Sequence, residues 1–471
     1  MSSAPIVLTA AMIATATGGD LLSGSPARVI DGFAIDSRTL QSGDLFFAIV
    51  AARDGHAYVA DAIARGAAGA MVSDAVADVE AGDGEDDPVL IRVHDTTIAL
   101  HDLGRFVRQQ SSATVVALTG SAGKTTTKET IATLLGGRFK VAKNKGNLNN
   151  HLGLPLSLLE LRHGADVAVM ELGMNHAGEI RVLVGIAEPE IRVWTNVGDA
   201  HMGHFTSQDA IADAKAEILD GARPTDRLIV NADDPRVMAR AGSFVGRRIT
   251  FGIAADADVG AEEVDDRGLD GTHLKLRIGD RVADVQTPLL GRGNLSNLLA
   301  AAAVATELGV MLPEIAERAA HLKPAAHRGA VVRLPGGVTV VDDSYNSSPT
   351  ALQRALEVIG RDRSARRKAA VLGEMLELGD HALRLHQDCG RAAAAVGLDR
   401  LIAVGGDAAK ALADAAVAAG MRRDAVTWTS SSGAASDLIL PWLSDGDLIL
   451  VKGSRGIKTD AVVDRITVEF S

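Results

Sequence analysis

The sequence predicts an α/β protein of three domains, in which the second and third domains are built around parallel sheets. The chain has 471 residues, enough for about three domains of ordinary size. Short apolar runs rich in β-branched residues alternate with helical stretches, as strands and crossover helices do in parallel sheets. A glycine-rich segment directly follows one of these runs. We expect the domains to cover residues 1–108, 109–327 and 328–471.

The composition restricts the partners and the compartment of the protein. Hydrophobic residues make up 47% of the chain and aromatic residues only 3%, so alanine, valine and leucine must fill the cores. A formal net charge of −12 argues against non-specific binding to nucleic acid or anionic lipid. The single cysteine, Cys389, excludes a disulfide framework. Because we find neither a membrane span nor a basic leader, we expect a cytoplasmic monomer without nucleic-acid or membrane partners.

The first domain is predicted from a short series of elements. An apolar run at 45–50 predicts a strand, and the pattern at 59–67 predicts a helix. The motif Asp36-Ser37-Arg38 precedes both elements. An acidic, glycine-containing stretch at 83–87 reads as a surface loop.

The central domain is predicted from four apolar runs, which we read as buried strands at 115–118, 167–170, 191–194 and 228–230. Apolar and polar residues then alternate over 274–278, the pair Gly279-Asp280 can turn, and a second strand follows. We therefore expect a hairpin, followed by a long alanine-rich helix over 295–308.

The third domain repeats the alternation of strands and helices, with strands expected at 338–341, 369–372, 401–404 and 448–451. Gly405-Gly406-Asp407 follows one of these strands and invites comparison with a dinucleotide-binding loop. The full Gly-x-Gly-x-x-Gly spacing is absent, so we read a plain strand-to-helix turn.

Residues 119–127 read Thr-Gly-Ser-Ala-Gly-Lys-Thr-Thr-Thr and follow the predicted strand at 115–118. Strand, glycine-rich turn and helix form the context in which backbone N–H groups hold phosphate oxygens. Lys124 can reach the terminal phosphates, and the hydroxyl of Thr125 can bind Mg²⁺. The general phosphate-loop pattern needs glycine at position 118, which is leucine here, so only the tighter form of the motif fits. The candidate nucleotide-binding residues are Thr119, Gly120, Ser121, Ala122, Gly123, Lys124, Thr125 and Thr126.

Three further residues can carry chemistry. Glu171 ends the predicted strand at 167–170, where its carboxylate can bind Mg²⁺ or cap the next turn. His201 lies in a loop and can be a metal ligand or proton carrier, although a lone loop histidine is more often a surface residue. Lys215 lies in a helical segment, where the pattern alone favours a solvated face.

Two polar clusters leave alternatives open. Asn149 and Asn150 lie in an asparagine-rich loop, and they can either build a turn or line a polar crevice. Asp343, Tyr345 and Asn346 follow the strand at 338–341. The adjacent acids at 342 and 343 can bind a ribose, a metal or an amine, or they can form an Asx turn.

Taken together, these motifs resemble the Mur ligase family, the ATP-dependent enzymes that build the peptide stem of peptidoglycan. The resemblance extends over nearly the whole chain. It is strongest to the member that adds D-alanyl-D-alanine, and four stretches carry it: 146–151, 171–179, 371–379 and 451–456.

The resemblance implies roles that spacing alone does not. The first domain would hold the UDP end of a precursor near Asp36, Ser37 and Arg38. Thr125 and Glu171 match a first Mg²⁺ site, and His201 matches a ligand of a second. Lys215 matches a lysine that carries a CO₂-derived carbamate in several members. Asn294 matches an adenine contact, Arg328 and Asp343 match contacts to phosphate and ribose, and Asn149, Asn150, Tyr345 and Asn346 are candidate substrate residues.

Two positions depart from the family pattern. The family often has histidine where this chain has Gly293, and it usually has glycine near Ala51 or Ala52. These departures concern the surroundings of the adenine and the backbone of the uridine-side loop.

The implied activity is ATP- and Mg²⁺-dependent ligation of D-alanyl-D-alanine to UDP-N-acetylmuramoyl-tripeptide through an acyl phosphate, with Lys124, His201 and Lys215 as catalytic candidates. The alternative within the family is the sister ligase that adds the diamino acid to the dipeptide precursor, but its Asp-Asn-Pro-Arg signature is absent. A guanine-nucleotide switch is a second alternative. It requires Asn-Lys-x-Asp, and the segment 144–147 lacks the final aspartate.

Overall fold

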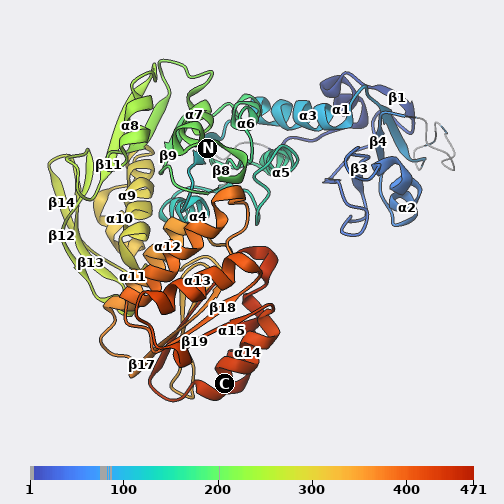
Figure 1. Ribbon diagram of the computed structural model, residues 1–471. Helices are drawn as coiled ribbons and strands as arrows, with labels where there is room; N and C mark the ends of the chain where they lie inside the picture. The colour runs from blue at the N-terminus through green and yellow to red at the C-terminus, as the bar shows by residue number, and fades with distance from the viewer. Residues whose placement is uncertain (1–4, 75–81, 83, 85–86, 201) are drawn as a thin grey trace.

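The computed structural model describes residues 5–74, 82, 84, 87–200 and 202–471. The described residues form three sheets, one in each of three units that follow one another along the chain. We call them the first unit (β1–β5), the central unit (β6–β14) and the third unit (β15–β20). The first unit stands apart from the other two and is joined to the central unit through helix α3, whereas the central and third units lie side by side (Figure 1).

The first unit has a five-stranded sheet in the order β1-β5-β4-β3-β2, in which only β1 runs antiparallel to its neighbour. The expected strand and helix are present as β3 and α2, and the expected loop at 83–87 lies partly outside the described residues. The elements are α1 (Ala10–Thr17), β1 (Asp20–Ser23), β2 (Gly32–Ala34), β3 (Asp44–Phe47), α2 (Val59–Ala64), β4 (Gly69–Val72), β5 (Val89–Arg92) and α3 (Thr96–Gln110).

The central unit has a nine-stranded sheet in the order β14-β13-β12-β11-β10-β9-β6-β8-β7. The strands from β7 to β12 are parallel, and the predicted hairpin β13–β14 extends the sheet in antiparallel fashion. Its elements are β6 (Thr114–Thr119), α4 (Lys124–Leu135), β7 (Val141–Lys143), α5 (Gly153–Leu159), β8 (Val167–Glu171), α6 (Glu179–Ala187), β9 (Ile191–Trp194), α7 (Gln208–Ala216), β10 (Arg227–Asn231), α8 (Pro235–Ala241), β11 (Arg247–Gly252), β12 (Val259–Asp266), β13 (Thr272–Ile278), β14 (Arg281–Thr287), α9 (Gly291–Glu307) and α10 (Leu312–Ala319).

The third unit has a six-stranded sheet in the order β15-β16-β20-β17-β18-β19, parallel except for β15. All four predicted strands are present, and Gly406 caps α13 in the predicted strand-to-helix turn. The elements are β15 (Ala330–Arg333), β16 (Thr339–Asp343), α11 (Pro349–Arg361), β17 (Arg367–Gly373), α12 (Ala382–Ala395), β18 (Arg400–Val404), α13 (Asp407–Ala418), β19 (Val426–Thr429), α14 (Ser432–Ile439), β20 (Asp447–Lys452) and α15 (Asp460–Phe470).

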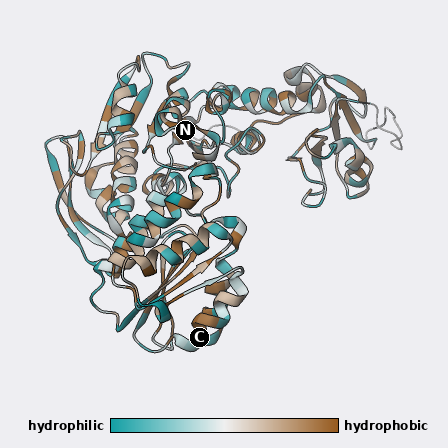
Figure 2. Ribbon diagram, in the orientation of Figure 1, coloured by the Kyte–Doolittle hydropathy of each residue, from teal (hydrophilic) through white to brown (hydrophobic). Residues whose placement is uncertain are grey.

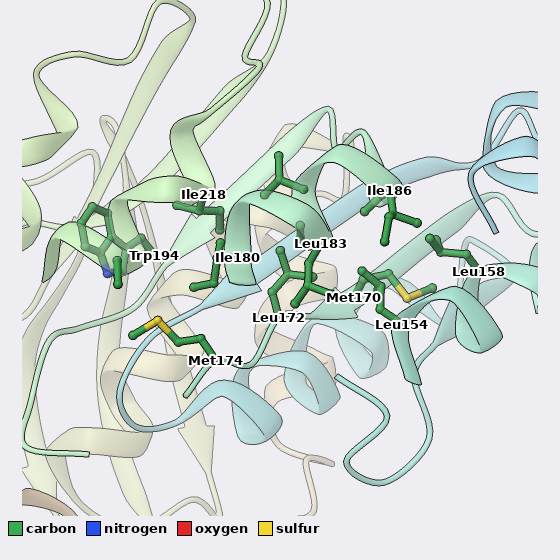
Figure 3. Close-up of a cluster of buried hydrophobic side chains, with 14 of the residues drawn as sticks. Leu154, Leu158, Met170, Leu172, Met174, Ile180, Leu183, Ile186, Trp194 and Ile218 are labelled. Atoms are coloured by element: carbon green, nitrogen blue, oxygen red, sulfur yellow. The ribbon is translucent and has the colours of Figure 1, made fainter. Parts of the chain in front are cut away.

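Buried aliphatic side chains hold the helices against the sheets. On one face of the central sheet, Leu154 and Leu158 of α5 and Leu183 of α6 pack with Met170 of β8 and Trp194 of β9 (Figure 3). Apolar residues follow the strands of the third sheet, while polar residues alternate along the covering helices (Figure 2). Each buried aliphatic side chain contributes about 1.5–3 kcal/mol, so these layers fix the strand ends that carry the site.

Helix α3 ties the first unit to the central unit. It packs against α1 on one side and against α5 and α6 on the other. Its Arg108 guanidinium donates to the carbonyl of Ala187 at 2.9 Å, and the ring of His101 lies 2.7 Å from the carbonyl of His151. The expected boundary at 108 falls inside this helix, and the two domain boundaries, at 108 and 327, stay predictions.

The order of the central sheet places three loops at one edge. Strand β6 lies between β8 and β9, with Leu118 opposite Glu171 and Thr119 opposite Trp194. The three strands are parallel, so the segments that follow them emerge together at their carboxyl ends, where open α/β sheets bind ligands.

Candidate active site

A cleft of about 600 Å³ opens at this edge, between the central and third units. Most of the predicted site residues line it. From the central unit these are Ser121, Ala122, Gly123, Lys124, Thr125, Thr126, Asn149, Asn150, Glu171 and Asn294, and from the third unit they are Arg328, Asp343, Tyr345 and Asn346.

The glycines of the phosphate loop make room for neighbouring segments. Gly123 has a left-handed φ of 81°, and a Cβ atom there would lie 2.3 Å from Asn297 Oδ1. A Cβ atom on Gly120 would lie 1.9 Å from Thr195 Oγ1. The side chain of Asn196 holds the loop by accepting from the N–H of Ala122 and donating to its carbonyl, both at 2.9 Å. The conformation of the loop therefore depends on Thr195 and Asn196, which follow β9, and on Asn297, which lies in α9.

Lys124 begins α4 directly after this loop. Its Nζ donates to the carbonyl of Gly120 at 2.8 Å, which folds the side chain back over the loop. Burial lowers the pKa of Lys124, although Glu171 opposes the shift. Thr119 plays a different part, because its buried hydroxyl donates to the carbonyl of Leu172 at 3.1 Å and does not line the cleft.

Glu171 is buried at the end of β8 and faces the first turn of α4. It accepts from the hydroxyl of Thr125 and from Nδ2 of Asn149, each at 2.9 Å, and Nζ of Lys128 lies 3.9 Å away. Among the described residues, its carboxylate makes no hydrogen bond to the turn at 173–176, so the capping alternative is not what the structure shows. Nor do any three His, Cys, Asp or Glu side chains of the described residues gather as a metal cluster.

The asparagine loop fills both roles that its sequence left open. Asn149 and Asn150 both line the cleft, and Asn149 bonds to Glu171 there. Asn150 also builds a turn, because its Oδ1 accepts from the N–H of Gly153, the first residue of α5, at 2.9 Å. Asn144 was not predicted, although its side chain bonds to the carbonyls of Leu148 and Glu171 and so fixes the loop beside the strand end.

Lys215 contradicts the reading of its pattern as a solvated helix face. Its side chain is only 1% exposed, because α7 packs against α6 and α8. Burial, with a contribution from the nearby charge of Lys124, lowers the pKa of Lys215 well below its usual range. His201 lies outside the described residues.

The two aspartates at the end of β16 take different ones of the roles predicted for them. Asp342 accepts from the N–H of Ser344 at 3.2 Å, which is an Asx turn. Asp343 points toward the cleft and pairs with Nζ of Lys452 at 2.6 Å, while burial raises the pKa of its carboxyl. Lys452 also donates to the carbonyl of Asn346 at 3.0 Å.

An aromatic ring and two guanidinium groups complete the wall formed by the third unit. The guanidinium of Arg328 lies 4.2 Å from the centroid of the Tyr345 ring, and that of Arg455 lies 5.8 Å from it. In the facing wall, Asn294 occupies the first turn of α9, where its Nδ2 donates to the carbonyl of Leu290 at 3.0 Å. With Lys124 in the central unit and Arg328 and Arg455 in the third, the cleft carries cations on both walls.

The predicted uridine-side residues lie elsewhere. Asp36 and Arg38 form an exposed ion pair at 2.6 Å in the first unit, and this pair lowers the pKa of Asp36 to about 2. Ser37 is buried beside them. None of the three lines the cleft, which lies between the other two units (Figure 1).

Several site residues were missed by sequence reasoning, namely Asn144, Thr195, Asn196, Asn297 and Lys452. Lys452, Thr195 and Asn196 could have been found from the sequence, because each lies at the carboxyl end of a predicted strand or directly after it. Asn144 and Asn297 carried no such signal, because only the tertiary fold brings them to the cleft.

A phosphate loop with a half-buried lysine and an acid at the neighbouring strand end, enclosed by a second α/β unit, defines a nucleotide-using enzyme of the phosphate-loop class. Residues 118–305 match the Mur ligase middle domain, and residues 327–455 match the Mur ligase glutamate ligase domain. The chain therefore belongs to the Mur ligase family and is an ATP-dependent, amide-bond-forming ligase.

Individual relatives resemble the chain over almost its full length. It is 32% identical to the UDP-N-acetylmuramoyl-tripeptide–D-alanyl-D-alanine ligase of Bacillus subtilis, over 92% of this chain and 93% of that protein. A crystal structure of MurF from Acinetobacter baumannii superposes with a TM-score of 0.87 at 31% identity, covering 99% and 100% of the two chains. MurF ligase from Thermotoga maritima in complex with ADP gives a TM-score of 0.80 at 27% identity, covering 93% and 97%. The predicted three-domain fold is thereby confirmed.

No helix among the described residues is both long and apolar enough to cross a membrane.

Gly123→Ala is expected to weaken ATP binding at least about tenfold in titration calorimetry, because the added Cβ meets Asn297 and the left-handed φ strains the loop. Gly178→Ala is the matched control. Gly178 also precedes a helix with a left-handed φ, of 91°, but a Cβ there meets nothing within 4 Å. Equal ATP affinities of the two variants would contradict the role assigned to the contact with Asn297.

Proposed function

We infer that this enzyme joins D-alanyl-D-alanine to UDP-N-acetylmuramoyl-tripeptide at the expense of ATP. The observation that carries the inference is the convergence of the phosphate loop, Glu171 and the cations of the third unit in one cleft, in a chain that aligns along most of its length with ligases named for this reaction.

The chemistry needs an activated carboxyl group, because a carboxylate is a poor electrophile for an amine. The γ-phosphoryl group of ATP moves to the terminal carboxylate of the tripeptide and forms an acyl phosphate. The amine of the dipeptide then attacks the acyl carbon, the amide bond forms, and phosphate leaves with the bonding electrons of the broken C–O bond. Phosphoryl transfer depends mainly on positioning and charge neutralisation.

The residues of the cleft suit these two demands. Lys124 and the loop N–H groups neutralise and hold the phosphates, and Arg328 adds positive charge from the opposite wall. Holding the reactants in place offsets about 7–11 kcal/mol of barrier. Closure of the third unit over the cleft would keep water from the acyl phosphate.

Thr125 and Glu171 would hold a magnesium ion, because their hydroxyl and carboxylate oxygens are ligands that Mg²⁺ prefers and both residues line the cleft beside the phosphate loop. The ion would supply charge neutralisation at the phosphates. We assign a second site to His201 and a carbamylated Lys215.

The buried state of Lys215 favours this modification. A lowered pKa leaves more of the amine neutral near pH 7, and only the neutral amine attacks CO₂. The neutral amine and CO₂ form an N–C bond and release one proton, which leaves a carbamate anion in place of the amine; starting from the protonated amine, two protons are released.

The sister ligase that adds the diamino acid is not favoured, since relatives that are 32% and 37% identical to the chain are named for addition of the dipeptide. The uridine-side role of Asp36, Ser37 and Arg38, the monomeric state and the cytoplasmic location stay predictions.

A phosphate-release assay with UDP-N-acetylmuramoyl-tripeptide and a panel of amines tests the activity. We expect release with D-alanyl-D-alanine and none with diaminopimelate. The matched reaction contains the dipeptide precursor and diaminopimelate, and turnover confined to that reaction would replace our assignment with the sister activity.

Lys124→Ala should lower kcat by about 10²–10³ while leaving the thermal unfolding midpoint within a few degrees of the wild-type value, since it removes one electrostatic donor from the transition state. Lys143→Ala is the control, because Lys143 is half-exposed and pairs with Glu129 outside the cleft. Wild-type turnover in Lys124→Ala would refute the role of this lysine.

Lys215→Arg should abolish ligation, because an arginine at this position stays charged and cannot form the carbamate. Carbon-13 NMR of the wild-type enzyme in labelled bicarbonate should show a carbamate signal that the variant lacks. A wild-type spectrum without this signal, recorded on active enzyme, would exclude the modification.

A further inference from the structure

Helix α9 and helix α11 meet at a contact that brings the third unit into the nucleotide side of the cleft. Gly293 lies in the first turn of α9, and the side chain of Arg354 reaches it from α11. A Cβ atom on Gly293 would lie 3.2 Å from Cδ and 3.3 Å from Nη1 of Arg354. The backbone of Gly293 does not have a left-handed φ, so the glycine here provides room for the arginine rather than a special conformation.

The guanidinium of Arg354 has no partner among the residues that the structure describes. No hydrogen bond or ion pair joins it to another side chain, and the negative charges that act on its pKa are those of Glu357 and Asp234. Arg361, on the same helix and in the same cleft, instead pairs with Asp266 at 2.8 Å. Arg354 remains exposed through the mouth of the cleft and is therefore accessible to a ligand.

The position of Arg354 relative to the phosphate loop indicates which part of a ligand it meets. Asn297 packs against Gly123 of the loop, and its Nδ2 donates to Asn294 Oδ1 at 3.2 Å. Gly293 precedes Asn297 by four residues, which is about 6 Å along a helix axis. Arg354 consequently lies farther from the phosphate loop than the phosphates of a bound nucleotide would. It lies where the nucleoside part of that nucleotide would be.

We propose that Arg354 packs its guanidinium against the adenine base of bound ATP and thereby sets the affinity of the enzyme for the nucleotide. A planar guanidinium stacks on aromatic faces, and a purine offers such a face between α9 and α11. The proposal rests on the use of ATP at the phosphate loop. It makes α11 of the third unit a part of the nucleotide site, so that base binding and the approach of the third unit are coupled.

The test compares Arg354→Met, which keeps an unbranched apolar side chain and removes the charge and the planar group, with Arg363→Met. We expect Arg354→Met to raise the KM for ATP about tenfold, with kcat and the KM values of both other substrates changed less than twofold. Arg363→Met should leave all four constants within twofold, because Arg363 is exposed and does not line the cleft.

Binding of inorganic tripolyphosphate separates the base from the phosphates. Calorimetry should give the same tripolyphosphate affinity for Arg354→Met and the wild type, whereas ATP affinity falls in the variant. An unchanged ATP affinity, or an equal loss for tripolyphosphate, would overturn the contact with the base. Failure of the wild-type enzyme to bind ATP at all would instead refute the nucleotide site itself.

A double-mutant cycle tests whether Gly293 acts through Arg354. Gly293→Ala should raise the KM for ATP in the wild-type background, because the new methyl group shifts the Arg354 side chain by a few tenths of an ångström, and should have no effect in Arg354→Ala. Additive effects of the two substitutions would show that the glycine acts independently and would contradict the proposed contact.

Discussion

The site of this ligase depends on the packing of the phosphate loop against the segment that follows β9. Gly120 lies so close to Thr195 that no side chain fits between them, and Asn196 holds Ala122 through two hydrogen bonds. Strand β6 runs between β8 and β9, so the same arrangement brings Thr125 to Glu171. A shift of one residue in the pairing of these strands would turn their side chains to the opposite face and separate these groups.

The second constraint on the cleft is electrostatic. Burial lowers the pKa values of Lys124 and Lys215, and the charge of Lys124 lowers the pKa of Lys215 further. Arg328 adds a further charge from the third unit. Such a cluster is costly unless anions compensate it, and Glu171 supplies only one. A triphosphate offers several negative charges at this place, so nucleotide binding relieves repulsion as well as forming contacts.

The division between what the sequence predicted and what it did not follows from burial. The strands β6, β8, β9 and β10 were predicted because they are buried on both faces and read as continuous apolar runs. Strands such as β7 and β12 were missed, since their exposed polar residues interrupt the run. The central phosphate loop was predicted because its chemistry is local, with strand, glycines, lysine and threonine adjacent in the chain.

Side-chain direction was harder to predict. Asn149 and Asn150 are neighbours of the same type and both line the cleft, yet Asn149 bonds to Glu171 and Asn150 bonds to the backbone of Gly153. Asp342 forms an Asx turn, whereas Asp343 points toward the cleft. Lys215 lies in a polar helical segment, and only the packing of α7 against α6 and α8 buries it. The sequence pattern predicts which face of a helix or strand is buried, whereas the roles of these side chains depend on neighbours that are distant in the sequence.

The glycines make the same point for function. Gly120 and Gly123 belong to a recognisable loop, and their spacing suggests flexibility as the reason for their presence. The structure adds close approach as a reason at both positions, against Thr195 and Asn297, and at Gly293 against Arg354. All three partners lie on other segments, and Arg354 lies in another unit. Each contact joins the phosphate loop, or helix α9 beside it, to a segment whose position relative to the loop must be kept for nucleotide binding. The space left by a missing side chain is thus a structural element of this cleft, and a substitution that fills it should act on ligand binding before it acts on the fold.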